Sequence, residues 1–204
     1  MNRIIHTISA AMEKPVIAML ILLIALTAVM VGLLLAEFFT EHRHLNITLP
    51  ALLDELKSNR EDRKKVIREA NIFPRQKEKL LEILRHPDYS NFMRESLAIR
   101  LLGEEQEYYD RRILLSDMIA KIAPILGLLG TLIPLGPGII ALGQGDTVTL
   151  STSLLTAFDT TVVGLICAGV AMVISAIRNQ WYRNYSSILE TLMECLLELE
   201  KKDA

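Results

Sequence analysis

Two apolar stretches of the sequence carry polar side chains whose types suit the movement of protons. The segment "TAFDTTVVGL" holds Thr156, Asp159, Thr160 and Thr161, and Thr131 lies in the apolar stretch that precedes it. A carboxylate binds and releases a proton, while a hydroxyl both donates and accepts hydrogen bonds and can hold a chain of water molecules. An aspartate in the middle of a membrane helix costs about 2.5–3.5 kcal/mol, so such a residue marks a functional site by default. These residues are our candidates for lining a polar path through the membrane.

Two of these residues have a second interpretation. The hydroxyl of Thr131 could bond to the backbone of its own helix. Asp159 lies near the outer end of its apolar stretch, where it could cap the helix or form a local hydrogen bond. Both interpretations stay open for both residues.

The chain has three stretches that could position these residues inside a lipid bilayer. The 22 residues from Pro15 to Ala36 and the 21 residues from Ile122 to Leu142 carry no charge, and the 30 from Val148 to Ile177 carry only Asp159. At a rise of about 1.5 Å per residue, each stretch crosses a hydrocarbon core of about 30 Å. The first is also longer than the apolar core of a cleaved signal peptide, about 7–15 residues, so we expect it to be retained. The predicted membrane helices are residues 15–37, 122–142 and 150–177.

The distribution of basic residues predicts how the chain is oriented. Residues 38–121 hold sixteen of the 22 Lys and Arg, the tail 178–204 holds four, and the loop 143–149 holds none. By the positive-inside rule, the central region and the tail are cytoplasmic, and the loop lies outside with the N-terminal segment 1–14. The net charge of −2 gives no indication of a nucleic-acid partner.

The cytoplasmic parts of the chain are expected to be helical extensions of the membrane helices. No proline interrupts the sequence from Asp88 to Ala123, which predicts one long helix that continues into the second span. The tail repeats apolar residues at helical spacing among glutamates, which predicts an amphipathic helix that continues the third span. The predicted fold class is therefore an all-α integral membrane protein with three transmembrane helices and long cytoplasmic helical extensions.

Glycines and prolines are expected to shape the second and third spans. Glycine lets two helices approach closely in a membrane, and proline removes a backbone donor and can kink a helix. The residues expected to do so are Pro124, Gly127, Gly130, Pro134, Pro137 and Gly164.

Other kinds of chemistry find little support in the sequence. No His, Cys, Asp or Glu spacing is typical of a metal site, and no arrangement is typical of nucleophilic catalysis, so we expect no metal, no cofactor and no enzyme. An intramembrane protease with two aspartates would need a second acid beside Asp159, and the predicted spans offer none.

The segments "APILGLLGT" and "TTVVGL", joined through a short outer loop, resemble the MotA/TolQ/ExbB proton-channel family. The order of the predicted elements is similar over the whole chain, and its size and layout are closest to TolQ/ExbB-type subunits. The resemblance implies a subunit of an ion-driven motor or energiser complex in the cell inner membrane, which couples the proton motive force to mechanical work.

The resemblance also implies partners and roles for particular residues. It implies a homopentameric ring around a dimer of single-span proteins similar to ExbD, TolR or MotB, each with a membrane aspartate. By motif position, Thr131 and Thr161 line the ring near that aspartate. Some relatives carry a glutamate near the position of Thr156, so the resemblance leaves the role of Asp159 open. Protons are the expected ion with sodium not excluded, and a non-conducting membrane scaffold is the alternative function.

Overall fold

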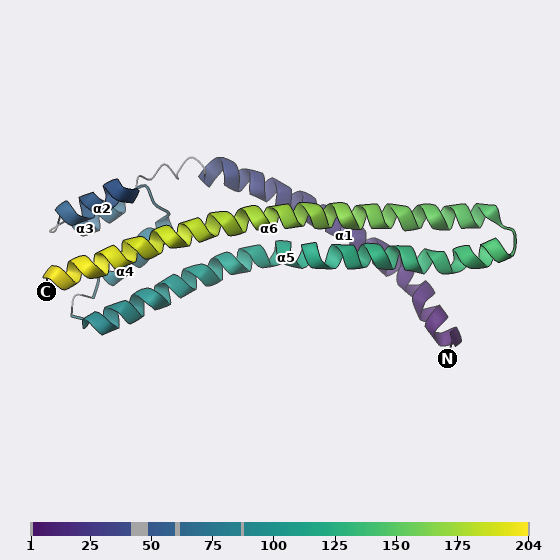
Figure 1. Cartoon of the computed structure of the whole chain (residues 1–204), viewed down its shortest axis with the longest axis horizontal. Helices are drawn as coiled ribbons and strands as arrows, with labels where there is room; N and C mark the ends of the chain where they lie inside the picture. The colour runs from purple at the N-terminus through teal and green to yellow at the C-terminus, as the bar shows by residue number, and fades with distance from the viewer. Residues whose placement is uncertain (1, 42–48, 60–61, 87, 204) are drawn as a thin grey trace. The chain divides into compact units, whose positions relative to one another are not determined.

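The computed structural model describes residues 2–41, 49–59, 62–86 and 88–203, and these residues form helices with short connections and no strand (Figure 1). The predicted all-α fold class is confirmed. The helices are α1 (Asn2–Glu41), α2 (Leu49–Ser58), α3 (Arg63–Glu69), α4 (Pro74–Ile83), α5 (Asn91–Gly143) and α6 (Thr147–Asp203).

Three of these helices are long and apolar enough to cross a membrane. They are α1 over Ala11–Phe39, α5 over Asn91–Gly143 and α6 over Thr147–Lys202. The predicted number of membrane helices is therefore confirmed, while the limits of each span inside its helix stay predictions. Both α5 and α6 extend well beyond the length a bilayer needs. The absence of proline from Asp88 to Ala123 and the helical spacing of apolar residues in the tail led us to expect this.

The connection between α5 and α6 is a closed turn of residues 144–146. Gly145 has a φ of +76°, the left-handed conformation that glycine adopts without strain. Its amide donates to the carbonyl of Leu142, and the amide of Asp146 donates to the carbonyl of Ala141, which is the Schellman end of a helix. Asp146 then caps α6, because its Oδ1 accepts from the amides of Val148 and Thr149, each at 3.1 Å. The turn thus ends one helix and starts the next with few free backbone groups.

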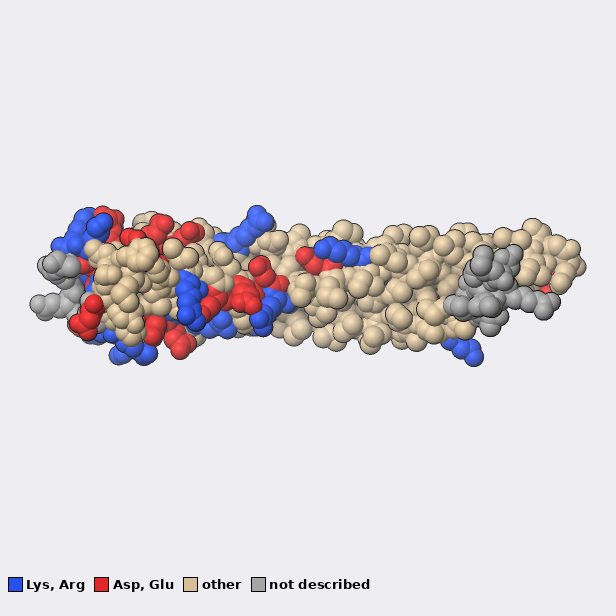
Figure 2. All heavy atoms as spheres, turned by 90° about the horizontal axis from the view of Figure 1, so that it is seen from below, with Lys and Arg blue, Asp and Glu red and all other residues tan. Residues whose placement is uncertain are grey.

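The chain divides into two compact units. Unit 1 consists of Met1–Leu35 and Ile113–Ile177, and unit 2 consists of Ala36–Arg112 and Arg178–Ala204. The units differ in charge, because residues 11–35 and 113–177 hold few charged side chains whereas unit 2 holds most of those in the chain. Figure 2 shows the result: red and blue side chains crowd one part of the surface, and another part is almost uniformly tan. The charged residues of these two stretches of unit 1 are Glu13, Lys14, Asp117, Lys121, Asp146 and Asp159.

Unit 1 is a three-helix packing built on small side chains. Ala123 on α5 and Ala171 on α6 are completely buried, and Val16 on α1 is 1% exposed. Large apolar side chains such as Ile21, Leu132 and Val173 are instead exposed, which suits helices surrounded by lipid. The buried cluster comprises Val16, Leu20, Leu23, Met30, Ile119, Ala123, Leu126, Cys167, Ala168, Ala171 and Ile174.

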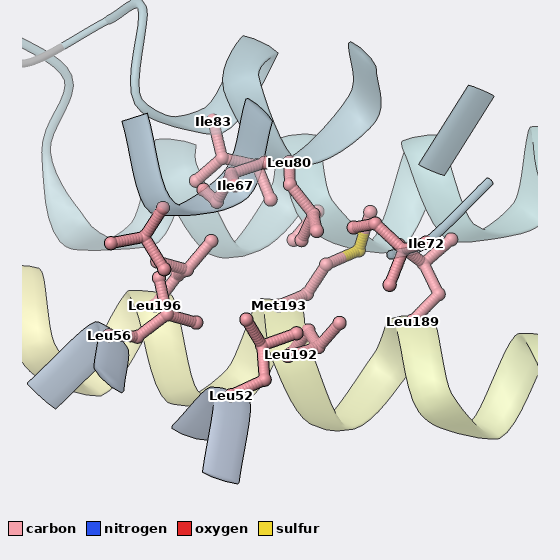
Figure 3. Packing of buried hydrophobic residues seen from close by; sticks show 12 residues of the cluster. Leu52, Leu56, Ile67, Ile72, Leu80, Ile83, Leu189, Leu192, Met193 and Leu196 are labelled. Carbon is pink, nitrogen blue, oxygen red and sulfur yellow. The ribbon is translucent and has the colours of Figure 1, made fainter. Parts of the chain in front are cut away.

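Unit 2 has a water-soluble type of core. Figure 3 shows leucines of α2, α4 and α6 pointing toward one another, with Ile67 of α3 and Met193 of α6 among them. Pro74 begins α4 at a first-turn position, where its missing amide proton costs nothing. The core comprises Leu52, Leu56, Val66, Ile67, Ile72, Leu80, Ile83, Ala98, Leu189, Leu192, Met193 and Leu196.

Candidate functional site

The candidate site is built on a direct backbone contact between α5 and α6 in unit 1. A Cβ atom added to Gly164 of α6 would lie 2.7 Å from the carbonyl oxygen of Ala123 and 2.8 Å from the Cα of Gly127. A Cβ atom added to Gly127 would lie 3.3 Å from the Cα of Gly164. The two helices can therefore approach this closely only because neither position carries a side chain.

Thr160 continues this contact toward the turn. Its side chain is 8% exposed and lies against Gly130, where an added Cβ atom would be 2.6 Å from the Cβ and Oγ1 of Thr160. The Thr160 hydroxyl donates to its own helix, with the carbonyls of Thr156 and Ala157 each 3.0 Å away. Thr160 therefore packs between the helices.

Thr161 makes a polar contact across the two helices. Its Oγ1 lies 3.4 Å from the carbonyl oxygen of Gly127 on α5. In an α-helix that carbonyl also accepts the amide of the residue four positions on, which is Thr131. The Thr161 side chain is half-buried, so its hydroxyl lies at the edge of the α5–α6 contact.

Thr131 lies at the same edge of the contact. It follows Gly127 by four residues, which places it about 40° round the helix from the contact residue. Its Oγ1 donates to the carbonyl of Leu128 at 2.7 Å, so the bond to its own helix is made and its oxygen keeps lone pairs that can accept. Thr131 of α5 and Thr161 of α6 therefore lie at one edge of the Gly127–Gly164 contact.

This edge is turned away from α1. A small cleft brings Val16 and Ile17 of α1 together with Ile133 of α5 and Thr156 of α6. On α5, Thr131 lies two residues before the cleft residue Ile133 and is therefore about 160° round the helix from it. On α6, Thr161 lies five residues after the cleft residue Thr156 and is about 140° round the helix from it. We name the surface that carries Thr131 and Thr161, opposite α1, the hydroxyl flank.

The structure does not bring Thr156 and Asp159 to the hydroxyl flank. Thr156 lies in the cleft beside α1 and donates to the carbonyl of Thr152 at 3.1 Å. Asp159 is exposed and lies about 160° round α6 from Thr161. Among the described residues, no side chain or backbone group is within hydrogen-bonding or ion-pairing distance of the Asp159 carboxylate.

The three prolines lie inside α5, and the helix continues through all of them. Pro134 is buried and lines the cleft beside α1, Pro124 is half-buried, and Pro137 is exposed. Within the part of the chain that the structure describes, no three His, Cys, Asp or Glu side chains lie close enough together to hold a metal ion.

A comparison with family models now identifies the chain. The model of the MotA/TolQ/ExbB proton channel family matches residues 69–191, which is more than half of the 204 residues. The chain belongs to the MotA/TolQ/ExbB family. No individual curated protein matches the sequence. The part that matches the MotA/TolQ/ExbB model contains α4, α5 and most of α6, and thus the whole hydroxyl flank.

The structure of this MotA/TolQ/ExbB subunit adds a polar contact that the sequence analysis missed. Asp117 of α5 accepts a hydrogen bond from the Oγ of Ser175 of α6, so a second polar pair joins the same two helices. The signal that could have indicated it is the charge at Asp117, only a few residues before the second apolar stretch.

A second missed group is a buried ion cluster in unit 2. The Glu37 side chain is 8% exposed; its Oε2 lies 3.0 Å from the Nε of Arg178, and its Oε1 lies 2.5 Å from the hydroxyl of Tyr182 and 3.5 Å from a guanidinium nitrogen of Arg112. Burial and the bond to Glu37 raise the pKa of Tyr182 above its usual value of 10.0. Tyr182 therefore stays a neutral donor, and the cluster ties residues of α1, α5 and α6 together by charge.

Proposed function

We propose that this MotA/TolQ/ExbB family member is the proton-conducting subunit of an ion-driven motor or energiser complex. In this proposal, five copies surround a dimer of single-span partners, each with a membrane carboxylate, and proton passage drives mechanical work. The complex lies in the cytoplasmic membrane, with the N-terminus outside and the tail in the cytoplasm. The observation that supports the proposal most directly is the hydroxyl flank, where Thr131 and Thr161 share one edge of the α5–α6 pair.

The chemistry of hydroxyls suits a partner carboxylate that changes its protonation state. A hydroxyl donates to a carboxylate and accepts from a carboxylic acid, so Thr131 and Thr161 stabilise both states without favouring either strongly. A fixed charge at the same place would instead hold the carboxylate ionised. The hydroxyls also support ordered water between the subunit and its partner.

The position of the hydroxyl flank suits contact with the membrane helix of a single-span partner. Because it lies opposite α1, a helix placed against it contacts α5 and α6 while α1 stays on the outer side of the pair. The membrane potential supplies about 2.3 kcal/mol for each charge that crosses 100 mV, enough to shift an equilibrium between two states about 50-fold. Each proton thus provides usable work if its passage is tied to a movement.

The experiment is proton flux in vesicles that contain the purified complex with its co-purifying partner. Thr161→Val removes the hydroxyl and keeps the shape of the side chain, and we expect flux to fall to the background of empty vesicles. Thr152→Val is the matched control, because Thr152 is exposed, its hydroxyl donates to the carbonyl of Val148, and it lies about 180° round α6 from Thr161. We expect near-normal flux in that variant.

Two flux results would count against the proposal. Normal flux in Thr161→Val would favour the alternative function, a membrane scaffold that conducts no ions. Flux that follows a sodium gradient and not a proton gradient would show that the conducted ion is sodium. Native mass spectrometry serves as the assembly control: both variants should keep the wild-type mass, and that mass should contain five copies of the 22.9 kDa chain.

A further inference from the structure

The Asp117–Ser175 pair is a polar contact between α5 and α6 with an unusual environment. Ser175 is buried, with 9% of its surface exposed, and its Oγ donates to the Oδ1 of the half-buried Asp117. Among the described residues, no nitrogen of a Lys, Arg or His side chain lies within 4.0 Å of the Asp117 carboxylate. The carboxylate therefore has a neutral hydrogen-bonding partner and no ion-pair partner among them.

The spacing of the pair matches that of the hydroxyl flank on both helices. Asp117 precedes Thr131 by 14 residues on α5, and Ser175 follows Thr161 by 14 residues on α6. Fourteen residues are close to four helical turns, so each residue lies about 21 Å along its helix and about 40° round from its counterpart. Since α5 and α6 are joined by a tight turn and run antiparallel, the two pairs lie on one flank at two levels.

The two acids Glu37 and Asp117 have different partners. Glu37 is bound by Arg178, Arg112 and the Tyr182 hydroxyl, so its carboxylate has two cationic partners. Asp117 has the Ser175 hydroxyl, which can donate to the ionised acid or accept from the protonated acid after rotating about its C–O bond.

We propose that Asp117 and Ser175 form a proton-binding site at the inner end of the hydroxyl flank, where a proton is held before its release to the cytoplasm. The inference rests on the proposed function. On uptake, the proton forms an O–H bond on the Asp117 carboxylate, and the Ser175 hydroxyl turns to accept from it. On release, the proton passes to water, the carboxylate is restored, and Ser175 donates again, so no further reactant is needed.

Three basic residues lie close to the pair along the sequence. On α5, Arg112 precedes Asp117 by five residues and the exposed Lys121 follows it by four; on α6, Arg178 follows Ser175 by three. The Nε of Arg178 is bound to the Glu37 carboxylate, and Arg112 lies 4.9 Å from the centre of the Tyr108 ring.

The test uses the vesicles described above, with the complex and its partner. Asp117→Asn keeps the shape of the side chain and removes the exchangeable proton, and we expect flux to fall about 100-fold, the typical scale for losing a positioned proton-transfer group. Asp117→Glu should restore much of it. Ser175→Ala should lower flux about tenfold, because one hydrogen bond to a charged group is lost. Asp110→Asn, an exposed acid of α5, is the control and should conduct normally.

Two further measurements distinguish a proton-binding role of Asp117 from a purely structural one. Infrared difference spectra taken while a proton gradient is applied should show a protonated carboxyl band that Asp117→Asn lacks. Native mass spectrometry should give the wild-type mass for every variant. Normal flux in Asp117→Asn together with lost flux in Thr161→Val would overturn this inference alone, whereas normal flux in both would overturn the proposed function as well. Lost flux in Asp117→Glu with an unchanged infrared band in Asp117→Asn would show a positional role only.

Discussion

The backbone contact between α5 and α6 makes a sharp prediction for Gly164→Ala. The new Cβ atom would lie 2.8 Å from the Cα of Gly127 and 2.7 Å from the carbonyl oxygen of Ala123. Carbon atoms pack best at about 3.5–4.0 Å, so the two helix backbones must separate by about 0.7–1.2 Å at this level. Because both opposing atoms belong to the backbone, no side-chain rotation relieves the overlap. The Thr161 Oγ1 to Gly127 oxygen distance, already 3.4 Å, would then exceed hydrogen-bonding range.

The expected cost is about 1–3 kcal/mol in the free energy of unfolding, the usual range for an overpacked core. Equilibrium unfolding of the purified chain in SDS, followed by circular dichroism, measures it. Gly169→Ala is the matched control on the same helix, because an added Cβ atom there meets nothing within 4 Å. Equal unfolding curves for wild type and Gly164→Ala, or an equal loss in both variants, would refute the close contact from which the hydroxyl flank is derived.

Two further predictions concern charged groups near the ends of the spans. Glu37→Gln leaves the 9%-exposed Arg178 without its counter-charge and should lower the free energy of unfolding by about 3–5 kcal/mol. Glu107→Gln, in an exposed pair, should cost less than about 1 kcal/mol. Equal effects of the two variants in the same SDS assay would contradict the role of Glu37 as the counter-charge of Arg178. The hydrogen bond from the Thr149 side chain lowers the pKa of Asp146 from its usual 3.8, so the cap is present at neutral pH and is lost as the pH falls through that lowered pKa. Amide exchange at Thr149 should be faster in Asp146→Ala at neutral pH, and the difference should shrink in acid; no difference at neutral pH would exclude the cap.

Much of the fold could be predicted because it depends on local pattern. The charge-free stretches indicated the membrane helices, and the absence of proline from Asp88 to Ala123 indicated the long α5. The helical spacing of apolar residues in the tail likewise indicated that α6 continues beyond the third span. These features are decided by burial and helix propensity within one segment, so they can be read from neighbouring residues.

The site could be predicted only in part, because it depends on which helix faces meet. The spacing of two residues between Asp159 and Thr161 already places them on nearly opposite sides of one helix, and this could have been seen in the sequence. Which side of α6 faces α1 could not have been seen in the sequence, since it follows from the packing of three segments far apart in the chain. The partners of Asp117 and Glu37 lie 58 and 141 residues away, beyond the reach of any periodicity.

The closed turn at residues 144–146 limits how the two helices can move. Its three residues hold the end of α5 and the start of α6 by backbone and side-chain hydrogen bonds, so one helix cannot slide lengthwise past the other without breaking them. Axial slip is therefore disfavoured, and any separation of α5 and α6 must increase with distance from this end. A relative movement of the two helices would therefore be a splaying motion that is larger on the side of Asp117 than at the turn. Lengthening the turn by flexible residues would remove that restriction.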